Sequence, residues 1–243
     1  CLVVISYYNA WPIKDLLALL EQLATIPSGA KFDTVVVNKG IEDLISLPVK
    51  YRHINVLYRE NTGYNIGAWS YGWDCNRQYE YYLFLQDKCV VVKENWLKTF
   101  VDKSVKNDGL IGESIVYDLP LCVSNDSGFI NNISILERKY LINKNISYRH
   151  LQTLIIFATR RTMESLNGFP CLGNAKSDGV AVEVSISRAV VSAGFFIKQV
   201  SFYPFEYIIH PQWSEERKKV RTVIGTLRRI FQIVRSNVKL SKL

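Results

Sequence analysis

The sequence contains no uninterrupted apolar stretch of the roughly 18–20 residues that a membrane-spanning helix needs, so we expect no segment to cross a bilayer. It also has no internal repeat and no low-complexity tract. Hydrophobic residues make up 48% and aromatic residues 12% of the 243 residues, which excludes a disordered or collagen-like chain. A chain of this length can bury a sizeable core in one large α/β domain or in two small ones.

Cysteine is scarce, and its spacing excludes two kinds of site. No two cysteines form a C-x-x-C pair, and their number is odd: Cys1, Cys75, Cys89, Cys122 and Cys171. A zinc site and a disulfide framework are therefore both poor interpretations. No signal-peptide pattern is visible either, so we expect reduced thiols in a cytoplasmic protein.

Acidic residues are outnumbered, but the excess of positive charge is confined to one end. The formal net charge is +8, and residues 215–243 hold nine basic and two acidic side chains, so +7 lies there and +1 in residues 1–214. A nearly neutral body without a basic stripe disfavours a nucleic-acid binder. In 215–243 most apolar residues fall within an arc of about 120° when plotted at 100° per residue, beside an arc of basic residues, with Lys219, Ile233 and Leu240 as exceptions. This pattern predicts a basic amphipathic helix over 214–243, separate from a body formed by residues 1–213.

The body alternates short apolar runs with an amphipathic helix. Residues 2–5, 34–37, 54–57 and 81–85 are predicted strands, and 13–24 has the spacing of a helix. Continuous apolar strands of this kind predict a mostly parallel sheet that helices cover on both faces. In such α/β sheets ligands bind beyond the carboxyl ends of the strands, where this sequence places polar residues.

The rest of the body is less regular. We expect strands at 90–92, 155–158 and 195–203, and helices at 94–105, 161–167 and 180–193. The Asn-rich stretch 125–150 is predicted to be an irregular insertion, with a helix only at 136–141.

A glycine loop at residues 61–68, N-T-G-Y-N-I-G-A, is the most informative segment. Gly63 and Gly67 would let the backbone approach a ligand closely, and the helix start that follows would offer free N–H groups to a phosphate. The loop lacks the G-x-G-x-x-G of a dinucleotide fold and the G-K-[ST] of a P-loop. An ordinary glycine turn before a helix is the alternative interpretation.

Asp87 follows the strongly apolar strand 81–85. A buried acid at that position is costly unless it binds a cation or accepts hydrogen bonds. Mg²⁺ and Mn²⁺ on a nucleotide diphosphate are typically held by one or two such carboxylates. The alternative is an aspartate that caps the next turn. His210 is a candidate second metal ligand, although a lone histidine in an aromatic stretch is more often structural.

Asp178 and Glu183 lie at the start and in the first turn of the helix expected at 180–193. A carboxylate there could deprotonate an acceptor hydroxyl as a general base. The alternative is that both acids simply stabilise the helix N-terminus through the macrodipole.

In order and spacing these segments, which cover about residues 2–200, resemble the GT-A-fold, family-2-like bacterial glycosyltransferases. Residues 3–9, V-V-I-S-Y-Y-N, look like the family's opening strand, and 61–68 is similar to the N-x-G-x-[DN]-x-G-A loop of polysaccharide and rhamnan-type transferases. Residues 83–87, L-F-L-Q-D, resemble the strand that carries the metal- and diphosphate-binding aspartate. Residues 166–169, then Asp178 and Glu183, then 193–195 resemble the acceptor-side block.

The resemblance implies an inverting glycosyltransferase with a GT-A fold: a Rossmann-like, mostly parallel central sheet flanked by helices. A hexose or deoxyhexose would move from a nucleotide-sugar to a hydroxyl of a glycan or lipid-linked acceptor, in cell-surface polysaccharide synthesis. Glu183 or Asp178 would be the base, and Asp87 and His210 would hold Mg²⁺ or Mn²⁺. The implied donor-binding residues are Ser6, Tyr8, Asn9, Asn38, Asn61, Gly63, Asn65, Gly67, Asp87 and Lys88.

The sequence departs from this family at two places. Asn38 and Lys39 stand where acids often contact the nucleobase and ribose, and the Q-D-K-C run at 86–89 keeps one acid of the usual two or three. Metal dependence is therefore an open question, and Lys88 is a candidate to offset the diphosphate charge instead. These departures favour the alternative function, a non-catalytic GT-A-like protein that binds a nucleotide or glycan.

The resemblance also bears on the tail. Two interpretations of residues 215–243 are open: attachment to an anionic membrane surface, or a helix packed on the body with a solvated basic edge. Because the acceptors of such enzymes are often lipid-linked, we expect a peripheral protein on the inner face of the cell membrane.

Overall fold

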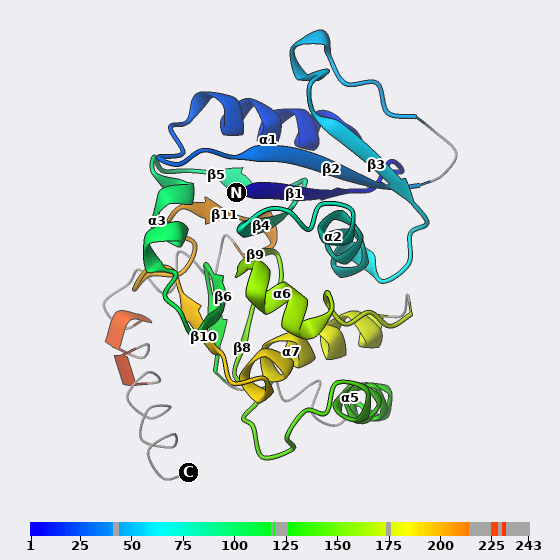
Figure 1. Ribbon diagram of the computed structural model, residues 1–243, viewed down its shortest axis with the longest axis vertical. Coiled ribbons are helices and arrows are strands. Elements are labelled where there is room, and N and C mark those ends of the chain that lie inside the picture. The colour runs from blue at the N-terminus through cyan, green and yellow to red at the C-terminus, as the bar shows by residue number, and fades with distance from the viewer. Residues whose placement is uncertain are drawn as a thin grey trace.

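The computed structural model describes residues 1–40, 44–117, 119, 126–173, 176–213, 225–227 and 230–231. Its centre is a seven-stranded sheet with the strand order β10-β6-β9-β4-β1-β2-β3 (Figure 1). The strands are β1 (Leu2–Tyr7), β2 (Asp33–Lys39), β3 (Asn55–Arg59), β4 (Tyr81–Gln86), β6 (Asp108–Gly112), β9 (Ile155–Thr159) and β10 (Phe196–Gln199). All of them run in one direction except β9, which pairs antiparallel with both β4 and β6. The expected mostly parallel sheet is therefore confirmed.

Helices cover both faces of the sheet. Because side chains alternate along a strand, Val3 and Ile5 of β1 point to one face and Leu2 and Val4 to the other. The first pair packs with α1 (Lys14–Thr25) and α3 (Trp96–Lys103). The second pair packs in a larger cluster with α2 (Tyr64–Asp74), α5 (Ser127–Lys139), α6 (Arg160–Leu166) and α7 (Lys176–Ser192).

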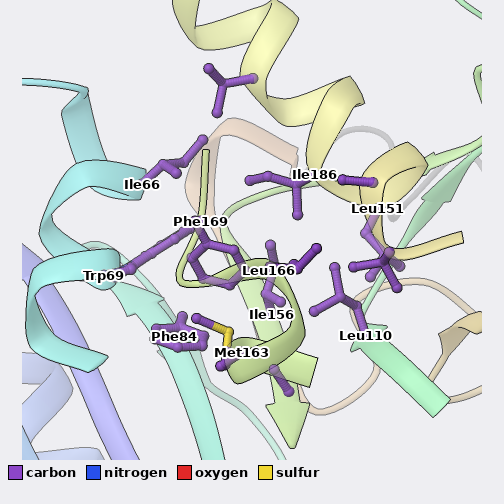
Figure 2. Close-up of a cluster of buried hydrophobic side chains, with 14 of the residues drawn as sticks. Ile66, Trp69, Phe84, Leu110, Leu151, Ile156, Met163, Leu166, Phe169 and Ile186 are labelled. Carbon is purple, nitrogen blue, oxygen red and sulfur yellow. The ribbon is translucent and has the colours of Figure 1, made fainter. Parts of the chain in front are cut away.

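Aromatic side chains fix α2 against the sheet. Figure 2 shows Trp69 of α2, Phe84 of β4 and Phe169 gathered in one cluster. The rings of Phe84 and Phe169 meet edge to face with centroids 4.8 Å apart. The buried Trp69 Nε1–H donates to the carbonyl of Leu85 at 2.9 Å. The middle of α2 is thereby held against the carboxyl end of β4.

The prediction of an irregular segment at 125–150 is wrong. Residues 127–139 form the regular helix α5, which packs beside α7 (Figure 1). Its buried residues Phe129, Ile133 and Leu136 lie at helical spacing, and the Asp126 side chain accepts a hydrogen bond from the Phe129 N–H at 2.9 Å. The many asparagines of this stretch favoured an irregular segment in the prediction, although the sequence contains both a helix N-cap and an apolar helix face.

Two further elements differ from expectation. The strand β6 was not predicted, because its two glycines interrupt the apolar pattern; a Cβ at Gly109 would lie 2.2 Å from Val190. The predicted strand at 90–92 exists as β5 (Val90–Val91), but it pairs outside the main sheet with β11 (Ile208–Ile209). The remaining short elements are η1 (Val49–Tyr51), β7 (Ile115–Val116), β8 (His150–Leu151) and η2 (Pro211–Trp213).

The predicted amphipathic helix at 214–243 lies largely outside the described residues. Within it, 225–227 and 230–231 are helical, and the side chains of Leu227, Ile230 and Phe231 are exposed. Among the described helices, none is both long and apolar enough to cross a membrane.

Candidate active site

The strand order places a topological switch point between β1 and β4. The strands β2 and β3 follow on one side of β1, and the chain then returns to the other side of β1 as β4. Ligands of open α/β sheets bind at the point where the strand order reverses in this way. Ser6 pairs in register with Gln86, and the Asp87 N–H donates to the Ser6 carbonyl at 3.0 Å. The first and fourth strands therefore bring Ser6 and Asp87 together at their carboxyl ends.

Asn65 ties the glycine loop to this edge. Its side-chain oxygen accepts hydrogen bonds from Ser6 Oγ at 2.8 Å and from Lys39 Nζ at 2.7 Å. Asn65 lies in the first turn of α2, so the start of this helix is fixed against the carboxyl ends of β1 and β2. The structure thus assembles residues 6, 39, 65 and 87 from four separate segments.

The two glycines of the loop also have a packing role. Gly63 precedes α2 in the left-handed region at φ +70°, and a Cβ there would lie 1.8 Å from Cys171 Sγ. A Cβ at Gly67 would lie 2.2 Å from the Thr62 carbonyl oxygen. Close packing alone therefore explains both glycines, so the interpretation as a glycine turn before a helix fits the geometry as well as a ligand loop does.

Lys39 belongs to the site, although only its position, and not the residue itself, was predicted to contact the donor. Only 6% of it is exposed, and it shares a strand face with Val35 and Val37, the face that α2 covers. Burial lowers the pKa of the Lys39 ammonium to about 8, the nearby Asp87 carboxylate opposes this shift, and Arg59 reinforces it. Lys39 lies two residues after the buried Val37 in a strand that is buried on both faces, and this spacing is the signal that could have identified the lysine.

Asp87 is buried as predicted, with 4% exposed. Burial raises the pKa of its carboxyl to about 6, although the ammonium groups of Lys39 and Lys88 act in the opposite direction. Within the described part of the chain, its Oδ2 has no hydrogen-bond partner. An acid in this state is ready to accept a hydrogen bond or a cation from a ligand.

Aromatic rings surround the two lysines. Lys88 is half-buried, with its Nζ 4.5 Å from the centroid of the exposed Trp11 ring. Lys39 Nζ lies 5.9 Å from the ring of Tyr8, which is also half-buried. The predicted Tyr8 and Lys88 therefore lie beside the buried core of the site, where they remain accessible to a ligand.

The predicted asparagines shape the turns around this core. Asn38 is fully buried, and its Nδ2 donates to the Gly40 carbonyl at 3.4 Å. A Cβ on Gly40 would lie 2.0 Å from Asn9 Oδ1, so the turn after β1 lies directly against the turn after β2. Asn61 is half-buried, and its Oδ1 lacks a hydrogen-bond partner among the described residues.

The side chains present fit a divalent cation poorly. His210 is buried and next to Lys88, and its Nδ1 accepts the Gln212 N–H at 3.2 Å, which leaves the proton of the neutral ring on Nε2. Burial lowers the pKa of His210 to about 4, and Lys88 adds to this shift. The described residues contain no group of three His, Cys, Asp or Glu side chains that could hold a metal ion. Asp87 would therefore have to bind the cation with little help from the protein.

The two candidate bases lie on α7, which begins earlier than predicted. Because α7 starts at Lys176, Asp178 is in the first turn, where the helix dipole favours an acid, and Glu183 is in the second turn. Asp178 Oδ1 accepts a hydrogen bond from Asn132 Nδ2 of α5 at 2.8 Å. This contact with α5 fits the structural interpretation of Asp178.

Glu183 is tied to the edge of the sheet that carries Asp87. Its Oε1 accepts the Thr153 N–H at 2.9 Å. Thr153 precedes Ile155, and Ile155 pairs with Leu85, two residues before Asp87. The antiparallel direction of β9 therefore brings Glu183 to the carboxyl edge of β4.

Opposing influences act on the pKa of Glu183. Burial raises the pKa of the Glu183 carboxyl, whereas His150 and the hydrogen bonds from Thr153 lower it. The neighbours of His150 in the sequence do not indicate a site residue, because its proximity to Glu183 depends on β8 packing against α7. A raised pKa brings a carboxylate closer to the range in which a general base works at neutral pH.

Comparison with known proteins supports the fold. No protein-family model and no curated protein matches the sequence. The structure of the mannosyltransferase PcManGT from Pyrobaculum calidifontis, in complex with GDP-Man and Mn²⁺, is similar with a TM-score of 0.53 and 14% identity, over 96% of this chain and 64% of that one. Glucosyl-3-phosphoglycerate synthase from Mycobacterium tuberculosis matches with a TM-score of 0.49 and 11% identity, over 94% of this chain and 78% of that one. With its mostly parallel sheet between two helical layers and its likeness to the mannosyltransferase, the chain has the GT-A fold.

Proposed function

We propose that this protein is a glycosyltransferase that uses a nucleotide-sugar donor. The observation that supports this most strongly is the cluster at the switch point of the GT-A sheet, where Asn65 holds Lys39 beside Ser6 and Asp87 has an unpartnered buried oxygen. Ligands of open α/β sheets bind at this position. The donor would place its diphosphate near Asp87 and Lys88 and its nucleoside near Tyr8, Asn9 and Asn38.

The transfer is proposed to invert the anomeric centre. The acceptor hydroxyl gives its proton to Glu183 or Asp178, its oxygen bonds to the anomeric carbon, and the bond from that carbon to the diphosphate breaks. The nucleoside diphosphate leaves with the bonding electron pair. Of the two acids we favour Glu183, because the register of β9 brings it to the edge that carries Asp87.

The finer assignment follows the sequence resemblance. We propose a hexose or deoxyhexose donor and a glycan or lipid-linked acceptor, in cell-surface polysaccharide synthesis. Neither the sugar nor the acceptor is needed for the first test. A ligand that binds the native state raises its stability by mass action, so a stabilising nucleotide identifies the donor class.

The test is a thermal-shift screen with UDP, GDP, CMP and dTDP, followed by transfer and donor-hydrolysis assays with the matching nucleotide-sugars, with and without EDTA. We expect one nucleotide to stabilise the protein and its sugar derivative to be turned over. Glu183→Gln should keep the thermal shift and lose most of the turnover. Absence of binding and of turnover with every donor would contradict the proposal.

A non-catalytic nucleotide- or glycan-binding protein is the second candidate. It is favoured by Asn38 and Lys39 at positions where the resembled family often has acids, and by the backbone hydrogen bond that engages Glu183. The same screen separates the two functions. Binding of a nucleotide-sugar without transfer or hydrolysis would support the non-catalytic candidate.

We propose that residues 215–243 attach the protein to an anionic membrane surface on the cytoplasmic side. The support is the +7 charge of this segment and the exposure of Leu227 and Phe231, at 61% and 68%. Binding to vesicles with anionic lipid should be salt-sensitive and should weaken in a Leu227→Ser/Phe231→Ser variant. Leu141→Ser, which changes an 85% exposed residue of the body, is the control. Equal binding of all three proteins would overturn the assignment.

A further inference from the structure

We propose that Lys39 supplies the positive charge that neutralises the donor diphosphate, so that this site binds nucleoside diphosphates without a divalent cation. The inference rests on the proposed function and adds the means by which the donor is held. The structure of the mannosyltransferase, by comparison, contains Mn²⁺ together with GDP-Man.

The position of Lys39 is the first support. It is the last residue of β2, only 6% of it is exposed, and its ammonium group is fixed by a 2.7 Å hydrogen bond to Asn65 Oδ1. A buried ammonium group is costly unless it is paired or hydrogen-bonded, and a neutral amide offsets only part of that cost. The nearby Asp87 carboxylate offsets a further part, and a bound anion would add to it.

The surplus of positive charge is the second support. Arg59 is the β3 partner of Lys39 in the strand register, and its Nη2 donates to Thr62 Oγ1 of the glycine loop at 2.6 Å. Lys88 directly follows Asp87. Within the part of the chain that the structure describes, none of these three cations forms an ion pair with a carboxylate. Lys39 and Lys88 thus act on the Asp87 carboxylate, with Asp15 as an opposing charge, and Arg59 acts on Lys39. The N-terminus of α2 adds partial positive charge.

The same arrangement disfavours a divalent cation. Lys39 and Lys88 both act electrostatically on the Asp87 carboxylate, and they would repel Mg²⁺ or Mn²⁺ placed on its free oxygen. A diphosphate has the opposite charge and can accept hydrogen bonds from both ammonium groups. The positive charge of the two lysines therefore favours binding of a diphosphate over binding of a divalent cation.

The test measures binding to the full chain by calorimetry, with inorganic pyrophosphate, UDP, GDP and dTDP as probes, in EDTA and again with Mn²⁺. For the wild type we expect at least one nucleoside diphosphate to bind, with affinities in the two buffers that agree within about twofold. In EDTA, Lys39→Met and Lys39→Gln should each weaken binding by about 10- to 100-fold, the factor that a charge-assisted hydrogen bond contributes.

Two controls separate the ionic role from a structural one. Lys39→Gln keeps a hydrogen-bond donor for Asn65 but lacks the charge. Because Lys39→Met removes a buried charge, the melting temperature of this variant without ligand should be equal to or higher than that of the wild type. Lys31→Met removes the same charge at the opposite end of β2, where the side chain is exposed, and should bind as the wild type does.

Three results would overturn the inference. If nucleoside diphosphates bind only with Mn²⁺, the inference is wrong but the proposed function stands. The same holds if both Lys39 variants bind with wild-type affinity. Failure of every nucleoside diphosphate to bind the wild type in either buffer would overturn the inference and the proposed function together.

Discussion

Buried polar side chains hold the carboxyl edge of the sheet together. Asn65 joins β1, β2 and α2 through one amide oxygen. Glu113, at the carboxyl end of β6 and 1% exposed, accepts the N–H groups of Glu206, Tyr207 and Ile208 at 2.9, 3.1 and 2.7 Å. Burial raises the pKa of Glu113 to about 8, against the lowering effect of these three donors. Glu113 thereby positions the segment that leads to His210.

Glu113→Gln should destabilise the protein. The amide can keep the bonds at one oxygen, but its NH₂ group faces a backbone N–H, so one buried donor loses its acceptor. A loss of about 1–3 kcal/mol in the free energy of unfolding is expected, measured by urea denaturation. Glu94→Gln changes an exposed glutamate in the same way and should have no measurable effect. Equal stability of the two variants would show that the Glu113 clamp contributes little.

At the scale of elements, the start of α2 depends on glycine. Gly63 needs its left-handed backbone and also lies against Cys171 Sγ, whereas a Cβ added at Gly194, which has a similar φ of +85°, would meet nothing within 4 Å. A comparison of substitutions at the two glycines therefore distinguishes the cost of backbone strain from the cost of steric contact. Strain alone costs about 1–2 kcal/mol for a residue with a Cβ.

Gly63→Ala should destabilise the protein by more than Gly194→Ala does. We expect about 1–2 kcal/mol for the Gly194 variant, and a larger loss for the Gly63 variant because of the contact with Cys171. In a Gly63→Ala/Cys171→Ala variant the extra loss should largely disappear. Thermal unfolding of the four proteins gives the comparison, and equal losses at both glycines would contradict the contact.

At the scale of the whole molecule, a buried ion pair joins α5 to α7. Arg188 of α7 is fully buried, and its Nη1 lies 2.7 Å from Glu137 Oε1 of α5. The Arg188 guanidinium also lies 4.6 Å from the centroid of the Tyr148 ring. This pair fixes the layer from which Asp178 and Glu183 project, at the end of the molecule far from β3 (Figure 1).

Arg188→Met should cost about 3–5 kcal/mol in the free energy of unfolding, because it leaves the Glu137 carboxylate buried without its partner. The double variant Arg188→Met/Glu137→Met replaces both charges and should regain most of that stability. Urea denaturation measures both. An additive loss in the double variant would show that packing, and not the ion pair, carries the contribution of Arg188.

Local patterns in the sequence predicted the first four strands and the polar residues that follow them. Continuous apolar runs predicted β1, β2, β3 and β4, and polar residues after these runs pointed to Asp87 and the glycine loop at 61–68. These signals lie within short windows of the chain, because the side-chain pattern of a strand or helix is a local property. The prediction was wrong at 125–150, where a polar composition obscured the apolar face of α5.

Contacts between residues that are distant in the sequence depend on how the elements assemble. Lys39 bonds to Asn65 across 26 positions of sequence, and Glu183 bonds to Thr153 across 30. The antiparallel direction of β9 brings Glu183 to the edge of the sheet that carries Asp87. The side-chain periodicity of β9 does not indicate this direction. Burial and charge surplus at Lys39 likewise depend on the packing of α2 over β2. Hydrophobic periodicity specifies which face of an element is buried, whereas the partner of a buried polar group is set by the assembled sheet.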